Sequence, residues 1–122
     1  MTEFADLNPT GRFVILIHDH PHLHWDFMLE TSGVLKTWRL AEEPRTGATT
    51  AATVLPDHRI EYLEYEGPVS HNRGTVTRFD AGTYQMDIGS KPPELLLAGQ
   101  NLSCRVRLAA GQFQFLPAID PI

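Results

Sequence analysis

Several features are scarce in this sequence, and each shortage excludes a class of protein. Cysteine occurs once, as Cys104, so neither an internal disulfide nor a cysteine-based zinc cluster can form. No apolar run approaches the ~20 residues that a membrane-spanning helix needs. Residues 1–12 include acidic groups and no basic segment ahead of an apolar stretch, which argues against a secretory signal. We therefore expect a soluble, cytoplasmic protein that has no membrane partner.

Positive charge is also scarce. The chain has 10 Lys and Arg against 15 Asp and Glu, which gives a formal net charge of −5 at pH 7. Proteins that hold duplex nucleic acid through many phosphates usually present a basic surface. The charge thus argues against extensive DNA binding. It does not exclude chemistry at a nucleic-acid end that is held by a metal and a few cations.

Linkers and repeats are absent as well. The 122 residues fit one domain, and no low-complexity tract or fixed-period repeat divides them. We expect a single domain over residues 1–122, in which residues 1–11 are free to form a flexible N-terminal arm. The sequence leaves the oligomeric state open.

Short strand-like segments alternate with turn residues along most of the chain. Residues 13–17 form an apolar run of buried-strand length, and residues 23–29 alternate between apolar and polar side chains. A turn at 31–33 leads into residues 34–39, so a hairpin is expected there. Further strands are expected at 51–55, 60–65, 75–79, 83–88, 101–108 and 112–116, with hairpin turns at 80–82 and 109–111 and one helical turn at 94–98.

This pattern predicts an all-β fold. Eight or nine short strands without a long helical period are typical of a sandwich or a barrel. A barrel is the better expectation because closure leaves no exposed strand edge. We predict a small closed β-barrel of about eight short, mostly antiparallel strands with at most one short helix.

Four of the six histidines lie within seven residues, and an aspartate follows at the same step: His18, His20, His22, His24 and Asp26. In an extended strand, residues 24 and 26 point to one face, about 6.5–7 Å apart. Pro21 interrupts the strand, so His18 is expected to approach from the end of the preceding strand rather than in register. Two imidazoles and a carboxylate suit Mn²⁺, Zn²⁺ or Fe²⁺, with positions left open for water or substrate. The spacing alone equally allows a solvated loop, and His20 and His22 are more simply explained as surface residues that tune local charge.

A second pair of polar residues enters a later segment. His58 and Tyr62 are four residues apart and would share a face of an unbroken strand. An imidazole beside a phenol can bind or protonate a phosphate oxygen. Ordinary packing explains such a pair equally well, so this spacing carries little weight by itself.

Several short motifs follow one another along the chain. They are Phe13-Val14-Ile15, His18-Asp19, His24-Trp25-Asp26-Phe27, Leu29-Glu30, Gly33-Val34-Leu35-Lys36-Thr37-Trp38, Asp57-His58, Glu61-Tyr62, Glu66-Gly67, Gly74-Thr75-Val76 and Gly82-Thr83-Tyr84. In type and order these motifs resemble the 3′-phosphoesterase domain family of bacterial DNA ligase D, over about residues 12–116. Several separated motifs in one order are far more specific than any single motif.

The resemblance implies a compact β-barrel with a polar cavity and a Mn²⁺-dependent activity at DNA 3′ ends. In that family a 3′-terminal ribonucleotide is removed and a 3′-phosphate is converted to a 3′-OH. His18, His24 and Asp26 match the family's metal ligands, and His58 and Tyr62 match residues that contact the scissile phosphate. The expected partners are a DNA 3′ end or another phosphoester, with a separate ligase or polymerase as a further candidate.

The sequence departs from the family pattern near the expected phosphate. Met28 stands where the pattern has arginine, and Glu42 stands where it has lysine. A guanidinium offers a fork of donors that matches phosphate, whereas methionine offers no cation. Loss of one donor to a charged transition state costs about 10²–10³ in rate in other enzymes. His20, His22, Arg39 or Arg45 are the candidates to compensate.

Two other interpretations stay open. One is a catalytically inactive relative that keeps the barrel and the metal as a structural or partner-binding module. The other is an Fe²⁺ and 2-oxoglutarate oxygenase, because His24-x-Asp26 with a distant His58 matches a facial triad. The chain is short for an oxygenase, and His18 would have no role in it. A cupin fits less well still, because Glu30 follows the histidines at the wrong interval.

Overall fold

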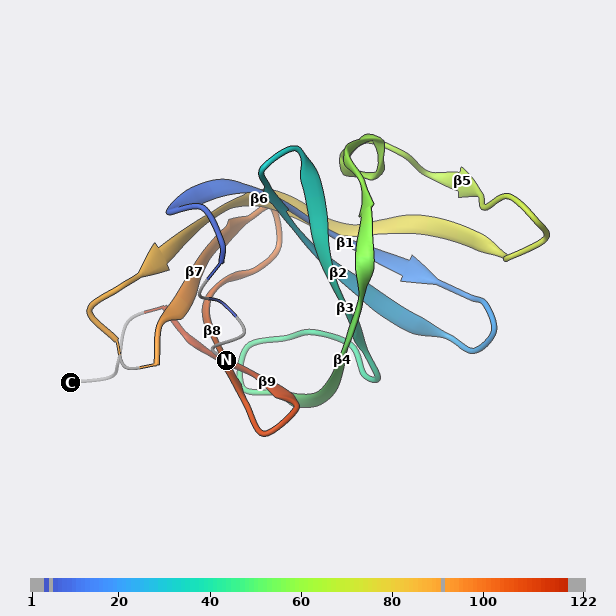
Figure 1. The fold of residues 1–122 in the computed structure, drawn as a ribbon. Helices are drawn as coiled ribbons and strands as arrows, with labels where there is room; N and C mark the ends of the chain where they lie inside the picture. The colour runs from blue at the N-terminus through green and yellow to red at the C-terminus, as the bar shows by residue number, and fades with distance from the viewer. Residues whose placement is uncertain (1–3, 5, 91, 119–122) are drawn as a thin grey trace.

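The computed structural model describes residues 4, 6–90 and 92–118, and these form an all-β structure (Figure 1). The described residues contain nine strands and one short 3-10 helix. The elements are β1 (Thr10–His18), β2 (His24–Thr31), β3 (Val34–Leu40), β4 (Thr49–Arg59), η1 (Ile60–Leu63), β5 (Gly67–Pro68), β6 (Thr75–Asp87), β7 (Glu94–Gly99), β8 (Ser103–Ala109) and β9 (Gln112–Pro117). Within the described part of the chain, no helix has the length and apolarity to cross a membrane.

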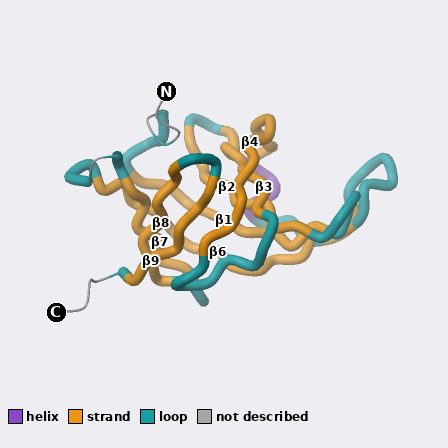
Figure 2. The backbone as a smooth tube through the Cα atoms, turned by 90° about the horizontal axis from the view of Figure 1, so that it is seen from below, coloured by secondary structure: helices purple, strands orange, loops and turns teal. Residues whose placement is uncertain are grey.

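Eight of the strands close into one antiparallel barrel. Their order is β1-β2-β3-β4-β9-β8-β7-β6, and β6 pairs back with β1 along nearly its whole length. The two-residue β5 extends the sheet beside the start of β6. Figure 2 shows strands making up most of the backbone, with the helix confined to one short segment near β3 and β4. The predicted closed barrel with at most one short helix is confirmed.

Aromatic side chains fill the barrel interior. Phe27 is fully buried at their centre, with its ring centroid 5.0 Å from that of Phe113 and 6.4 Å from that of Trp38. Phe4, from the segment before β1, packs edge-on against Trp38 and Phe113. Burial of each large ring contributes about 2–3 kcal/mol, so this cluster is the main source of stability.

Strands β1 and β2 form the first hairpin of the chain, and both bury the face that points away from the aromatic core as well. On β1, Phe13 points into the aromatic core, whereas Val14 and Leu16 point into a second apolar cluster. On β2, Phe27 and Met28 divide in the same way, as the period of two requires. The second cluster consists of Val14, Leu16, Met28, Leu35, Leu63 and Val76. Through Met28 and Val76, this cluster forms the floor of the cavity at the candidate site.

Two predicted strands turn out to be one. Residues 75–79 and 83–88 were expected to flank a turn at 80–82, but β6 runs through that segment. The strand bends there because its register against β1 shifts by one residue, a β-bulge. The buried Asp80 carboxylate accepts backbone N–H bonds from Ala81, Asn101 and Leu102 at 2.8–3.0 Å, so it anchors the β7–β8 turn.

Two further segments differ from expectation. Residues 94–98 are strand β7 rather than a helical turn, and Leu95 and Leu97 alternate into the core. Residues 60–65 are not a strand, because β4 continues to Arg59 and the chain then winds into η1. The turns at 31–33 and 109–111 are confirmed, since Gly33 and Gly111 both adopt positive φ at hairpin corners.

Candidate functional site

Three side chains of the types that bind metals converge at the end of the β1–β2 hairpin where the connection joins the two strands. His18 is the last residue of β1 and His24 the first of β2, and the two are paired directly across the hairpin. Asp26 lies two residues further along β2, on the same face as His24. One ligating atom from each lies within 4.8 Å of the others. The expected convergence is present, but the expectation that His18 would lie out of register is wrong.

The hydrogen bonds of the two histidine rings leave one nitrogen of each ring facing the Asp26 carboxylate. Because a carbonyl oxygen only accepts, His24 donates Nδ1–H to the His22 carbonyl, and His18 donates Nε2–H to the Arg73 carbonyl, each at 2.8 Å. In neutral rings the other nitrogens, His24 Nε2 and His18 Nδ1, then carry lone pairs. Each lies 3.1 Å from a carboxylate oxygen of Asp26. Either a proton on each ring or one shared metal ion relieves the resulting repulsion.

Burial favours a shared ion as the partner of these atoms. His24 and Asp26 are 4% and 2% exposed, so water has little access to them. Among the described residues, His24 Nε2 and Asp26 Oδ1 are buried with no hydrogen-bond partner. Two imidazoles and one carboxylate form a donor set that fits Mn²⁺ or Zn²⁺. The residues present therefore fit a divalent metal.

The turn between β5 and β6 is fastened to this cluster. Besides the bond from His18 to the Arg73 carbonyl, the Asp19 carboxylate accepts the Thr75 backbone N–H at 2.7 Å. Gly74 lies at φ 78°, and a Cβ there would come within 2.3 Å of the Asp19 carboxylate. Only glycine fits this approach. The β1–β2 and β5–β6 connections consequently lie side by side at one end of the molecule (Figure 1).

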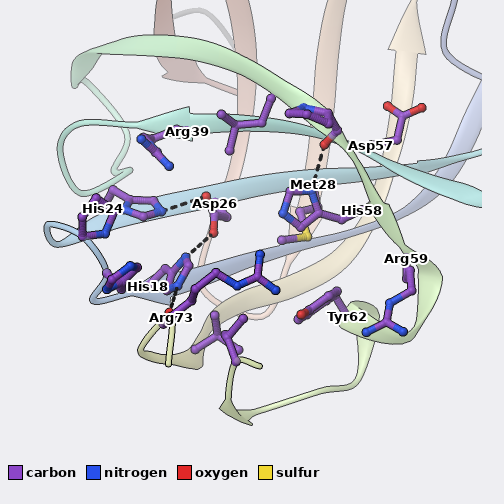
Figure 3. Close-up of a pocket in the computed structure, with 16 residues that line it drawn as sticks. His18, His24, Asp26, Met28, Arg39, Asp57, His58, Arg59, Tyr62 and Arg73 are labelled. Carbon is purple, nitrogen blue, oxygen red and sulfur yellow. Dashed lines mark hydrogen bonds and ion pairs between the residues drawn. The ribbon is translucent and has the colours of Figure 1, made fainter. Parts of the chain in front are cut away.

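A cavity of about 610 Å³ opens beside the cluster, which is large enough for a nucleotide-sized ligand. His18, His24 and Asp26 lie on one side of it, and His58 and Tyr62 on the other (Figure 3). The His58 and Tyr62 ring centroids are 5.8 Å apart, at an interplanar angle of 71°. These two meet because the chain winds through η1, and not because they share a strand face.

The His58 ring is held in place by the backbone. Its Nδ1 donates to the Pro56 carbonyl at 2.9 Å, which leaves Nε2 as the nitrogen for another partner. Tyr62 also packs edge-on against Tyr65, at 5.7 Å between ring centroids. Both site rings are partly buried and supported on one side, so their orientation toward the cavity is restricted.

The departures from the family pattern can now be placed. Met28 lines the cavity on the same face as Asp26, as the strand period predicts, and it is 1% exposed. Of the compensating candidates, Arg39 and His20 line the cavity. Within the described residues, neither His22 nor Arg45 is part of its lining. Glu42 is exposed and also lies outside this lining.

Sequence reasoning missed two cations of the cavity, Arg59 at the end of β4 and, on the β5–β6 turn, Arg73. Arg73 precedes the Gly74-Thr75-Val76 motif and enters the site through the turn that holds His18. The positive φ angles of His71, Asn72 and Gly74 shape that turn. The available signal was Asn72 and Gly74 on either side of the arginine, which indicates a turn but not which part of the fold that turn contacts.

Fold and cavity together define a small antiparallel β-barrel domain with a candidate divalent-metal site. The family model for the DNA ligase D 3′-phosphoesterase domain matches residues 17–115. The chain belongs to the DNA ligase D 3′-phosphoesterase domain family, which is a family of hydrolase domains.

Similar proteins agree with this family. The multifunctional non-homologous end joining protein LigD of Mycolicibacterium smegmatis is 34% identical over 98 residues, 76% of this chain and 13% of that protein. LigD of Pseudomonas aeruginosa is 31% identical over 78 residues, 60% of this chain and 9% of that protein. LigD of Mycobacterium tuberculosis is 34% identical over 80 residues, 62% of this chain and 10% of that protein. The chain thus spans about a tenth of the length of these relatives.

Proposed function

We propose that the chain is a divalent-metal-dependent phosphoesterase that removes a 3′-phosphate or a 3′-terminal ribonucleotide from DNA ends. The observation that carries this proposal is the convergence of His18, His24 and Asp26 at the wall of a nucleotide-sized cavity, where the described His24 Nε2 and Asp26 Oδ1 are buried without a hydrogen-bond partner. Family membership supports phosphoester hydrolysis as the reaction class. Mn²⁺ is the proposed metal, and the same donors also accept Zn²⁺ or another divalent ion.

His18, His24 and Asp26 would hold the ion, which when bound supplies a Lewis acid and an activated water. The carbonyls that accept from the two imidazoles fix which nitrogen of each ring is free to bind. Because Asp26 is buried, its carboxylate stays directed at both rings. These contacts prepare the site before any ligand enters.

On the opposite wall, His58 and Tyr62 are proposed to act on the phosphoryl group. Because Nδ1–H of His58 bonds the Pro56 carbonyl, the imidazolium form would carry its second N–H on Nε2, where it would stabilise transition-state charge or give a proton to the leaving 3′ oxygen. Tyr62 donates its O–H to a phosphoryl oxygen. With a 3′-phosphate as substrate, water adds to phosphorus, the bond from phosphorus to the 3′ oxygen breaks, and a 3′-OH end and inorganic phosphate result.

Met28 is expected to make this activity weaker or altered in specificity, because it supplies no cation beside the metal ligands. A DNA-end substrate agrees with the cytoplasmic location expected from the sequence. A separate ligase or polymerase that uses the resulting 3′-OH is the proposed partner. The alternative is an inactive relative whose metal has a structural or partner-binding role.

The test is a Mn²⁺ titration combined with a 3′-phosphorylated primer. We expect Mn²⁺-dependent release of phosphate, a loss of at least about 100-fold in His58→Gln, and little change in the control His71→Gln. His71 is exposed and does not line the cavity among the described residues. Metal binding without turnover of either DNA substrate would reject the enzyme in favour of the inactive relative.

A further inference from the structure

The candidate cavity has a local charge opposite to that of the whole chain. The chain carries −5, yet three of its 10 Lys and Arg line this one cavity, against two aspartates. The three are Arg39, Arg59 and Arg73. Such a concentration of cations in a concave site attracts an anionic ligand.

Arg39 lies on β3, beside the cluster of His18, His24 and Asp26. It is paired in register with Asp26 on β2, so the two residues are neighbours across the sheet. The residue is half-buried, and among the described residues its Nε has no hydrogen-bond partner although it is shielded from solvent. A buried guanidinium N–H without an acceptor is unfavourable, and an anion that enters the cavity would satisfy it.

Arg73 reaches the same cavity from the β5–β6 turn. Its guanidinium donates from Nε to the Ser70 carbonyl at 2.8 Å and from an amino group to Ser70 Oγ at 3.1 Å. These bonds use two of its five N–H donors and hold the side chain in one orientation. Figure 3 shows this side chain extending from beside His18 toward the middle of the cavity. Its position is therefore prepared before a ligand binds.

We propose that Arg39 and Arg73 form an anion-binding subsite of this cavity, in which they hold a phosphoryl group next to His18, His24 and Asp26. This inference rests on the proposed function for its ligand class, a phosphate mono- or diester. Met28, which follows Asp26 on the same face of β2 and belongs to the apolar floor, carries no charge, so the cations of this subsite come from neighbouring elements. Arg59 is a weaker candidate, because its guanidinium lies 3.9 Å from the Glu61 carboxylate, which already offsets its charge.

The arginine at position 73 has two separable parts. Its backbone carbonyl orients His18, and that carbonyl survives any side-chain substitution. Its guanidinium belongs to the proposed subsite. Arg73→Gln therefore removes the anion contact while the metal ligands keep their orientation. A merely structural role for the side chain would disturb both.

The experiment is a titration of metal-free protein with inorganic phosphate, followed by the arginine Nε–H signals in NMR spectra. We expect the Arg39 and Arg73 signals to shift with one common dissociation constant. Arg39→Gln and Arg73→Gln should each raise that constant about five- to tenfold, since each removes a charge-assisted contact. Arg39→Lys should fall between, because it keeps the charge and loses the fork. Arg45→Gln, an exposed arginine outside the cavity lining, is the matched control.

The second readout is the Mn²⁺ affinity of the same variants. Arg73→Gln should stay within about twofold of the unchanged protein, because the carbonyl that orients His18 remains. If Arg73→Gln lowered the affinity for Mn²⁺ but not the affinity for phosphate, the subsite would be overturned. The same would follow if the control Arg45→Gln raised the phosphate dissociation constant as much as Arg39→Gln and Arg73→Gln do. Phosphate binding that depends on both arginines, in a protein that turns over no DNA substrate, would support the subsite and contradict only the proposed function.

Discussion

The two faces of the first β-hairpin differ in chemistry although the same strands form both. On one face Phe13 and Phe27 enter an aromatic core, in which Phe27 alone contacts four other rings. On the other, His24 and Asp26 stand above a smaller apolar floor with polar atoms left unpartnered. Successive side chains along β2 point to opposite faces, so each residue enters the aromatic core or the polar site according to its place in the alternation.

This difference separates stability from function within one element. The aromatic face gains free energy by removing ring surface from water. The opposite face gives up free energy by holding a buried carboxylate between two imidazoles, an arrangement that needs protons on the rings or a bound ion. Substitutions on the two faces should consequently act on different measurements, and the following experiments test that separation.

The largest effect is expected on the aromatic face. Phe27→Ala should lower the free energy of unfolding by about 3–5 kcal/mol, because Phe27 is fully buried and contacts several rings. Denaturant unfolding measures the loss. Protein that remains folded should bind Mn²⁺ with unchanged affinity, and a large parallel loss of affinity would show that the faces are not separable.

The converse substitution is Asp26→Asn on the other face. We expect at least about a 100-fold loss of Mn²⁺ affinity, because an amide replaces the carboxylate of a three-residue donor set. Without metal, the variant should unfold at the same or a higher temperature, since its amide can donate to His24 Nε2. A marked drop in the melting temperature of the metal-free variant would argue for a structural ion pair in place of a metal site.

A smaller effect is expected at the floor of the site. Met28→Arg should raise turnover of a 3′-phosphorylated primer about tenfold if position 28 limits activity. It should also cost about 1–3 kcal/mol of stability, because Met28 is 1% exposed and packs in the second cluster. Met28→Leu is the control, which keeps volume and adds no charge. An unchanged rate in a folded Met28→Arg protein would reject position 28 as the limit.

The smallest effect concerns the barrel wall far from the cluster. Burial, and secondarily the nearby Asp80 carboxylate, raises the pKa of the Cys104 thiol from 9.0 to about 11. The folded state therefore retains a proton that the unfolded state loses, so stability present below pH 9 is lost as pH rises toward 11. We expect about 1–2 kcal/mol less stability at pH 10.5 from this group. Cys104→Ala should show a shallower pH dependence in denaturant unfolding, and an equal slope would contradict this cause.

The sequence predicted the barrel and the convergence of the cluster well, because both depend on local periodicity. Alternation along β2 placed His24, Asp26 and Met28 on one face, and the short 31–33 turn fixed the hairpin of β2 and β3. Short-range pattern and turn chemistry are sufficient for such features. The direct pairing of His18 with His24 was not predicted, because Pro21 in the connection argued against a regular register.

Features that depend on distant partners were missed. Asp80-Ala81-Gly82 has the composition of a turn, but it pairs with β1 as part of β6, and the bulge lies just before it at Phe79. The Asp80 carboxylate is held there by bonds from the distant residues Asn101 and Leu102. The strand character of residues 94–98 likewise depends on pairing with β6 and β8. Arg73 reaches the cavity only because its turn is fastened to β1. No pattern near position 73 encodes that distant contact.

The central claim is that His18, His24 and Asp26 share one divalent ion. The most direct measurement is an anomalous-scattering map from crystals of the protein grown with Mn²⁺. The account predicts a single strong peak between these three side chains, which Asp26→Asn removes. A Mn²⁺ peak bound elsewhere, with the three side chains unchanged and no density between them, would contradict the account.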